Sequence, residues 1–195
     1  LAVEGVGWFR GAADDVLSRY VGAAASVDAD VIVRVTADCP VLDPGVVDQA
    51  ISCYLTQADG LDYVSNTIER TYPRGLDVEI FPRRVLDHLD QVSRSAEERE
   101  HVTLHLLRHR SRYRIAQVSS SINYADYYWT VDTEEDFQVM ERVYEALYPA
   151  NPRFSWWEVL ELFRAHPQLV EVNRSHATVH DARLRALVQE IPERS

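Results

Sequence analysis

The stretch of sequence that decides the fold is DVIVRVTADCPVLDP, residues 30–44. It contains a β-branched apolar run at 31–36, of the kind found in a buried strand. That run stops at 38–40, and Asp43 followed by Pro44 is typical of a helix start, with an N-cap and a proline at the first helical position. A strand, a short loop and a helix in this order are typical of an α/β crossover.

The chain on either side of this stretch alternates in the same way. Apolar spacing predicts a helix before it, and patterns of period two predict three short strands after it. A region of mixed polarity reads as one helix with an interruption at 93–96. The predicted helices are 14–25, 44–55 and 83–108, and the predicted strands are 62–65, 77–81 and 113–119.

Two capping boxes mark helix starts in the last third of the chain. Thr133 is followed by Asp136, and Ser155 by Glu158. The segment 148–153 between the two helices is the best candidate for a linker. We therefore predict an α/β domain at 1–150 and a small helical appendage at 151–195. The predicted apolar faces are Phe137, Met140, Tyr144 and Leu147 in the first helix, and Trp156, Val159, Leu160 and Phe163 in the second.

Composition excludes several classes of protein. The 195 residues fit one ordinary globular domain, and the formal net charge of 20 − 31 = −11 argues against nucleic acid and anionic membranes as partners. No apolar run approaches the roughly 18 residues of a membrane span. The first residues lack a basic segment followed by an apolar core, so we expect a cytoplasmic protein. Cys39 and Cys53 are too few for a disulfide scaffold and are expected to be free thiols.

Two aspartates stand where ligands of open α/β sheets commonly bind. Asp38 follows the predicted strand 31–36, and Asp132 follows the apolar 129–131 directly before a helix start. Two carboxylates on neighbouring strand ends can hold Mg²⁺ together with substrate phosphates. The alternative is that Asp38 is a turn residue and Asp132 a helix-entry cap.

A second possible metal site lies in the predicted helix 83–108. His101, His105 and His109 recur every four residues, a spacing that can hold a metal. No further acidic ligand at zinc-motif spacing is obvious, so we interpret them as a solvated helix face.

Five blocks in consistent order carry a resemblance that spans about residues 5–170. The sequence resembles the cytidylyltransferase family of the spore-coat polysaccharide type, which is similar to CMP-Kdo synthetase and acylneuraminate cytidylyltransferase. The resemblance implies a three-layer α/β sandwich with a mostly parallel sheet, and transfer of CMP from CTP to a sugar, often an acidic one, with release of pyrophosphate. The blocks are FRGAADDVLSRY (9–20), DVIVRVTADCPVLDP (30–44), DYVSNTIERTYPRGLDVEIF (62–81), EREHVT (98–103) and WTVDTEEDF (129–137).

The resemblance also implies roles for individual residues. The metal-binding aspartates of the family fall on Asp38 and Asp132, with Mg²⁺ as the cofactor. A homodimer is implied as well. The residues implied to line the nucleotide are Arg34, Thr36 and Ala37, and those implied to line the sugar are Arg70, Tyr72, Gly75, Leu76, Asp77, Glu79, Glu100 and His101.

The chain begins where family members are about a third through, so we expect it to be truncated at the N-terminus. The first strand and the basic loop that wraps the triphosphate are then missing. This leaves open a noncatalytic remnant or partner subunit that lacks the phosphate-binding loop. A glycosyltransferase of the same broad fold is a third possibility, although such enzymes carry an Asp-x-Asp motif where this chain has Asp38-Cys39-Pro40.

Overall fold

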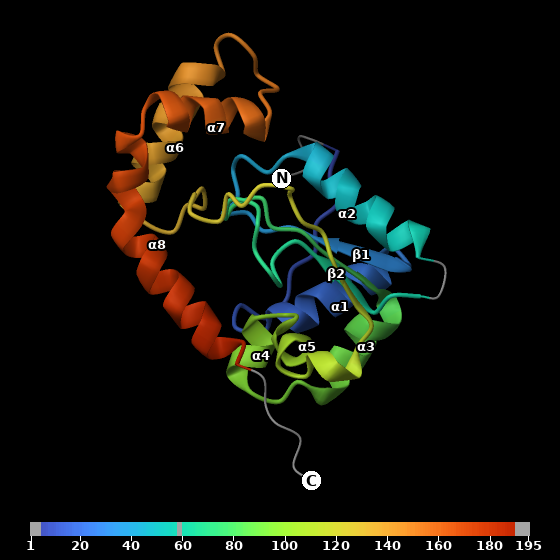
Figure 1. The fold of residues 1–195 in the computed structure, drawn as a ribbon. Helices are drawn as coiled ribbons and strands as arrows, with labels where there is room; N and C mark the ends of the chain where they lie inside the picture. The colour runs from blue at the N-terminus through green and yellow to red at the C-terminus, as the bar shows by residue number, and fades with distance from the viewer. Residues whose placement is uncertain (1–4, 58–59, 190–195) are drawn as a thin grey trace.

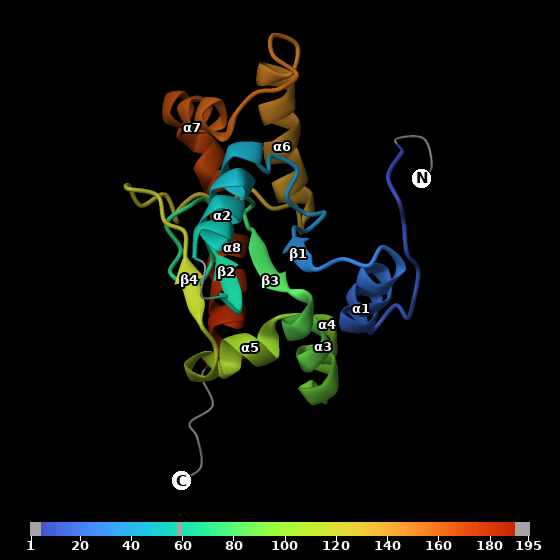
Figure 2. The same ribbon diagram turned by 90° about the vertical axis from the view of Figure 1, so that its right-hand side faces the viewer.

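The computed structural model describes residues 5–57 and 60–189, with the backbone alone at 175–181 and 183–185. It is an α/β fold built on a four-stranded sheet in the order β1-β3-β2-β4 (Figures 1 and 2). The strands are β1 (Val31–Arg34), β2 (Tyr63–Ser65), β3 (Glu79–Pro82) and β4 (Ile115–Gln117). β1, β2 and β4 lie within segments predicted to be strands, and β3 extends one residue beyond the predicted 77–81.

The prediction of a mostly parallel sheet is wrong for these strands. β3 pairs antiparallel with both β1 and β2, and only β2 and β4 pair in parallel. The connection 66–78 between β2 and β3 contains no helix as the structure describes it, so the chain turns back beside the strand it has just left. Between β2 and β4, by contrast, α3 (Arg83–Val92), α4 (Ala96–Glu100) and α5 (Leu104–Arg108) supply the crossover that a parallel pair needs.

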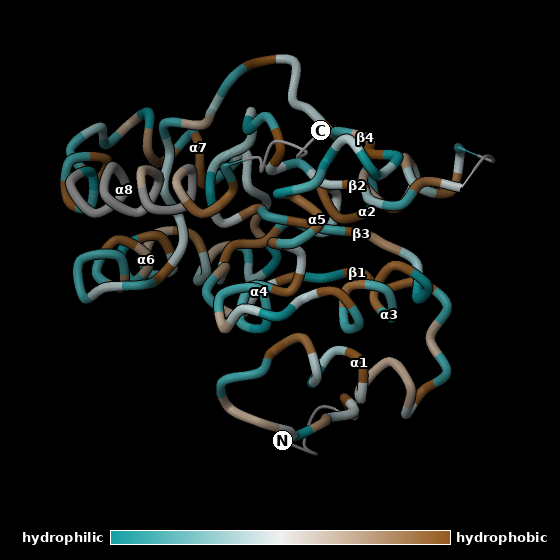
Figure 3. The backbone as a smooth tube through the Cα atoms, turned by 90° about the horizontal axis from the view of Figure 1, so that it is seen from below, coloured by the Kyte–Doolittle hydropathy of each residue, from teal (hydrophilic) through white to brown (hydrophobic). Residues whose placement is uncertain are grey.

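Helices cover both faces of the sheet, because its side chains alternate in direction. Val64 and Ile80 point into one apolar cluster, with α2 (Pro44–Thr56), α6 (Glu134–Leu147) and α7 (Trp156–Ala165). Tyr63 and Phe81 point into the other, with α1 (Val16–Ser26), α3 and α5. Figure 3 shows α6, α7 and α8 (Gln168–Leu187) gathered at one side of the fold and α1 lying beyond β1.

β1 is an edge strand and not the buried strand that its sequence suggested. Only Ile32 is buried, while Val31, Val33 and Val35 are 38–41% exposed. The reason is the position of β1 at the end of the strand order, since α2 contacts β2 and β3 on the face where these valines point.

The predicted helix starts at Asp43, Thr133 and Ser155 are confirmed. The Asp43 carboxylate accepts a hydrogen bond from the Gly45 amide at 2.7 Å, and both capping boxes are formed. The predicted interruption at 93–96 separates α3 from α4, where Ser95 forms another capping box. A second break at 101–103, which was not predicted, separates α4 from α5. Both cysteines are free thiols.

The apolar face of α6 differs from the prediction. Phe137 is 54% exposed and Tyr144 36% exposed, whereas the buried residues are Asp136, Val139, Met140 and Val143. The helix is rotated because the Asp136 carboxylate is turned inward, where it accepts a hydrogen bond from the Asn173 side chain of α8 at 2.9 Å. In α7 the predicted face is buried in full.

The C-terminal helices pack closely on the rest of the chain. The Trp156 amide donates to the Asp43 carboxylate at 3.0 Å, and the Trp156 ring meets Tyr72 and Tyr124 edge to face. α8 runs from α6 and α7 down to α5, where the Arg108 side chain donates to the Leu187 carbonyl at 2.9 Å (Figure 1). The division into domains at residue 150 stays a prediction. In the part of the chain that the structure describes, no helix is both long and apolar enough to cross a membrane.

Candidate functional site

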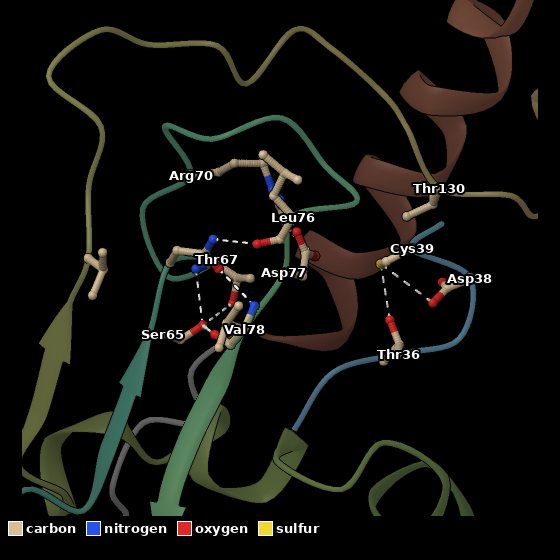
Figure 4. A network of polar contacts seen from close by, with 12 residues as sticks. Thr36, Asp38, Cys39, Ser65, Thr67, Arg70, Leu76, Asp77, Val78 and Thr130 are labelled. Carbon is tan, nitrogen blue, oxygen red and sulfur yellow. Dashed lines mark hydrogen bonds and ion pairs between the residues drawn. The ribbon is translucent and has the colours of Figure 1, made fainter. Parts of the chain in front are cut away.

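Three segments meet where β1 ends and β3 begins. They are the turn after β1 (residues 35–43), the β2–β3 loop (residues 66–78) and the extended segment 127–132 (Figure 4). The Val131 amide donates to the Asp38 carbonyl at 2.9 Å. On the other side, the Arg74 amide donates to the Tyr127 carbonyl at 3.0 Å, and the Trp129 amide to the Arg74 carbonyl at 2.8 Å. The segment 127–132 therefore lies between the other two.

The β2–β3 loop is fixed at its base by a buried asparagine. The Asn66 side chain donates to the Leu76 carbonyl at 2.7 Å and accepts from the Val78 amide at 3.0 Å. Both ends of the loop are thus joined through one side chain, which holds the residues between them in place.

Gly75 allows the β2–β3 loop to approach the neighbouring segment. Its φ is 103°, in the left-handed region, and a Cβ placed on it would lie 2.8 Å from the carbonyl carbon and oxygen of Trp129. A side chain at this position would therefore push the two backbones apart.

Asp38 and Asp132 come close through this backbone arrangement. Asp38 is half-buried and Asp132 is exposed, so solvent reaches both. One oxygen of Asp132, Oδ2, accepts hydrogen bonds from the Tyr128 hydroxyl at 2.7 Å and the Thr130 hydroxyl at 3.3 Å. Burial, reinforced by Asp132, raises the pKa of Tyr128, so its phenol stays protonated and donates.

These two carboxylates fit Mg²⁺ by the chemistry of their donors. Mg²⁺ prefers oxygen and is commonly held by one or two carboxylates together with substrate phosphates. Among the side chains that the structure describes, no group of three or more histidine, cysteine, aspartate or glutamate residues is placed to hold a metal ion. The arrangement therefore suits a cation that arrives with a phosphorylated ligand better than an all-protein metal site.

An ion pair lies in the β2–β3 loop, opposite these carboxylates. Both terminal nitrogens of Arg70 donate to the two oxygens of Asp77, at 2.6 and 2.8 Å (Figure 4). Burial raises the pKa of Asp77, but the Arg70 charge and its hydrogen bonds outweigh burial, so the pKa lies below its ordinary value. Asp77 is therefore ionised at neutral pH.

Cys39 lies in the turn after β1, between Thr36 and Asp38 in its side-chain contacts (Figure 4). Its Sγ is 3.2 Å from the Thr36 hydroxyl and 3.7 Å from the Asp38 carboxylate. Burial, together with the charges of Asp77 and Asp38, raises the pKa of the thiol to about 12. Cys39 is therefore protonated at neutral pH and a poor nucleophile.

A second cluster, built around a buried carboxylate, lies on the other side of β3. Glu79 forms an ion pair with Arg34, its partner across the strands, and accepts from the hydroxyls of Tyr63 and Thr103, each at 2.5 Å. Glu79 is 7% exposed. Its carboxylate is thus occupied by groups of the protein itself.

The remaining predicted residues fall in different places. Tyr72 and Leu76 are buried in the apolar cluster of α2, α6 and α7, with the Tyr72 hydroxyl donating to Gln49 at 2.7 Å. Ala37 is exposed beside Asp38. Glu100 and His101 lie at the end of α4, on the side of the sheet that carries α1, α3 and α5. The structure thus places the segments that carry Asp38, Asp132 and the Arg70–Asp77 pair side by side, and separates Glu100 and His101 from Tyr72 and Leu76.

Sequence reasoning missed the residues that orient the predicted ones, above all Tyr128 and Thr130. A pattern in the sequence could have indicated them, because the polar positions 128, 130 and 132 alternate with apolar Trp129 and Val131. In an extended segment such positions share one side. Thr103, which reaches Glu79 from α5, carried no signal of this kind.

The histidines do not form the solvated face that was predicted. His105 and His109 are half-buried with ring centroids 4.5 Å apart, and His105 Nδ1 lies 3.1 Å from the Glu98 carboxylate. The side chains of His105 and His109 therefore contact the protein on one side and solvent on the other.

Comparison with known proteins gives consistent relatives. The chain is 28% identical over 167 residues to the spore coat polysaccharide biosynthesis protein SpsF of Bacillus subtilis, covering 84% of this chain and 67% of that protein. It is 26% identical over 171 residues to an uncharacterized protein of Methanocaldococcus jannaschii, covering 87% and 68%. No family model matches the chain.

Among solved structures, the fold is similar to that of a cytidylyltransferase from Leptospira borgpetersenii. The TM-score is 0.81 with 30% sequence identity, over 85% of this chain and 69% of that one.

Proposed function

Because the chain belongs to the cytidylyltransferase family, we propose that it transfers CMP from CTP to a sugar hydroxyl with release of pyrophosphate, in surface polysaccharide synthesis. In this proposal Asp38 and Asp132 are the carboxylates that hold Mg²⁺ with the triphosphate. The proposal further includes an acidic sugar as the acceptor, a homodimer and a cytoplasmic location.

One observation carries the proposal. The hydrogen bond from the Val131 amide to the Asp38 carbonyl joins two segments that are 93 positions apart in sequence. It sets two solvent-accessible aspartates at one place, at the end of β1. The two residues that the family resemblance marks as metal ligands are therefore neighbours in the fold.

The reaction requires positioning and charge neutralisation more than covalent chemistry. The sugar oxygen forms a bond to the α-phosphorus, the bond from that phosphorus to the pyrophosphate oxygen breaks, and the hydroxyl proton leaves to solvent. When bound, Mg²⁺ would offset the negative charge of the phosphates. The chain's own contribution is to hold Asp38 and Asp132 at the phosphate and the β2–β3 loop opposite them, so that the acceptor approaches from the loop side.

Arg70 is our candidate for recognition of an acidic sugar. Its guanidinium is positioned by Asp77 in the loop that faces the two aspartates. Both side chains are partly exposed, at 14% and 23%. An incoming carboxylate can share the planar donors of Arg70, since an arginine offers five N–H groups.

The experiment is a turnover assay with α-labelled CTP, Mg²⁺ and pairs of acidic sugars and their neutral counterparts. We expect label in a CMP-sugar and one pyrophosphate released per label transferred, with the acidic sugars preferred. Asp38→Asn and Asp132→Asn should each lower the rate about 100-fold or more, because each removes a charge that acts on the triphosphate. Asp48→Asn, the same change at an exposed position of α2, is the matched control and should leave the rate unchanged.

Other outcomes point to the alternatives. Full activity of both aspartate variants would contradict their role. An inability of the chain to bind CTP in the presence of Mg²⁺ would favour the noncatalytic function. Turnover of a nucleotide sugar without pyrophosphate release would instead indicate a glycosyltransferase.

A further inference from the structure

We propose that Tyr128 is a positioning residue, whose hydroxyl fixes the orientation of the Asp132 carboxylate toward a divalent cation bound with CTP. This inference rests on the proposed function and goes beyond it, because it assigns a role to a residue that does not touch the substrate or the cation.

The contact itself is short and well sheltered. The Tyr128 hydroxyl donates to Asp132 Oδ2 at 2.7 Å, and the Thr130 hydroxyl reaches the same oxygen at 3.3 Å. Tyr128 is 6% exposed and Thr130 4% exposed, whereas Asp132 is open to solvent. Two buried hydroxyls thus hold one oxygen of an otherwise exposed carboxylate and restrict its rotation.

Tyr128 is itself fixed from three sides. Its backbone forms an isolated bridge with Arg74, and the guanidinium of Arg74 lies 5.7 Å from the centre of its ring. Its carbonyl accepts from the Asn173 side chain of α8 at 3.1 Å. The phenol is therefore held by backbone, charge and a buried amide, and not by the carboxylate alone.

Asn173 also connects Tyr128 to the far end of the Asp132 segment. The same amide nitrogen donates to Asp136 at 2.9 Å, and the other oxygen of Asp136 accepts from the Asp132 amide at 3.1 Å and the Thr133 amide at 2.9 Å. The backbone of Asp132 and its side chain are thereby tied to one network. Asn173 is 2% exposed, so water does not compete for it.

The expected consequence follows from how carboxylates bind cations. A carboxylate that is already oriented loses less freedom when it binds, and removing the groups that orient a ligand typically lowers metal affinity 10- to 100-fold. Tyr128→Phe keeps the ring and its contact with Arg74 and removes only the hydroxyl. We expect the affinity for the cation to fall by about that range.

The probe is Mn²⁺, titrated into the chain in the presence of CTP while the electron paramagnetic resonance signal of free Mn²⁺ is measured. Tyr128→Phe should weaken Mn²⁺ binding about 10- to 100-fold. Thr130→Val should weaken it in the same direction by less, because its contact is longer. The maximal turnover rate of Tyr128→Phe should approach that of the unmodified chain once the cation is saturating.

The matched control is Tyr72→Phe. The buried Tyr72 donates to the Gln49 side chain at 2.7 Å, so this variant also loses one tyrosine hydrogen bond but leaves Asp132 and the turn that carries Asp38 intact. Its Mn²⁺ affinity should be unchanged, and thermal unfolding of both variants checks that they are folded to the same extent. Equal weakening in the two variants would mean a merely structural role and overturn the proposal.

Two further outcomes separate this inference from the proposed function. If the unmodified chain binds Mn²⁺ with CTP and Tyr128→Phe binds it equally well, the positioning role is wrong and the proposed function stands. If the unmodified chain neither binds Mn²⁺ with CTP nor turns CTP over, both are overturned.

Discussion

Two acidic residues, two positions apart at the start of β3, each bind an arginine, and the two pairs differ in the elements that they join and in the exposure of the carboxylate. Glu79 and Arg34 lie across paired strands, and Glu79 also accepts from the hydroxyls of Tyr63 and Thr103. Asp77 and Arg70 form a two-pronged pair inside one loop. The carboxylate side chain is 9% exposed in Glu79 and 23% in Asp77, whereas the two arginines are similarly exposed. We call these the closed pair and the open pair.

The difference shows that one fold can use an arginine–carboxylate pair for two purposes, to hold elements together and to contact a ligand. The closed pair joins β1, β2, β3 and the start of α5, so its energy goes into holding the sheet and its helices together. The open pair joins only parts of the β2–β3 loop, and its carboxylate is the more exposed of the two. A buried pair is costly to break because a lone charge is left without water, whereas a partly exposed one is readily solvated.

The largest effect is expected for Glu79→Gln, which tests whether the closed pair stabilises the fold. The change removes the counter-charge of Arg34, and breaking a buried pair commonly costs about 3–5 kcal/mol. Urea unfolding should report a loss in that range, with an unchanged dependence on urea concentration. Glu161→Gln, at an exposed pair on α7, is the control and should cost less than about 1 kcal/mol. A loss at Glu79 no larger than at Glu161 would mean that the closed pair does not hold the fold.

Gly75→Ala should have the next largest effect. The added Cβ would meet the Trp129 backbone at 2.8 Å in a left-handed conformation, and such strain costs about 1–3 kcal/mol. Since the displaced segment carries Asp132, the variant should also bind CTP and Mg²⁺ more weakly. Gly7→Ala, where an added Cβ meets nothing within 4 Å, should leave both unfolding and binding unchanged. Unaltered stability of Gly75→Ala would show that the loop can move away from Trp129.

Asp77→Asn tests the open pair, which we expect to matter less for stability than the closed pair and more for sugar binding. Loss of a charge-assisted hydrogen bond costs about 1–2 kcal/mol here, less than at Glu79, because solvent can replace part of the contact. The larger change should appear in the assay, as a raised KM for the sugar with little change in kcat. If Asp77→Asn destabilised the chain as much as Glu79→Gln, the distinction between the two pairs would disappear.

The smallest effect concerns pH. Burial raises the pKa of Asp77 and Arg70 lowers it further than that, so the folded-state pKa lies below its ordinary value of 3.8. A lowered pKa stabilises the fold at pH values above 3.8, and this stabilisation is lost as the pH falls through the folded-state value. The free energy of unfolding of Asp77→Asn should therefore converge with that of the unmodified chain as the pH falls below about 4. A gap that stayed constant down to pH 2.5 would contradict the assignment.

How far the sequence predicts the molecule depends on how local each feature is. The helix starts at Asp43, Thr133 and Ser155 were predictable because a cap involves only a few neighbouring residues. The direction of β3 was not, since a short strand has the same pattern in either direction and the deciding feature is the helix-free connection before it. The exposed valines of β1 were likewise misjudged, because burial depends on where a strand lies in the sheet.

The candidate site divides in the same way. Asp38 and Asp132 were predicted from their positions beside apolar runs. The structure places the segments that carry them side by side, and their role as metal ligands stays a prediction. Glu79 was predicted to line the sugar, but the structure buries it against Arg34, a partner 45 positions away that no local pattern indicates. Tyr128 was missed because its role lies in a contact with another side chain and not in a motif.

The long helix α8 has a mechanical consequence. Its 20 residues span about 30 Å. One end is fastened through Asn173 to the segment that carries Asp132, and the other through the Leu187 carbonyl to Arg108 of α5. A helix held by contacts at both ends restricts sliding of the layers that it connects. Shortening α8 from its C-terminal end would remove its contact with Arg108, and we expect the connection between α5 and the segment that carries Asp132 to be lost.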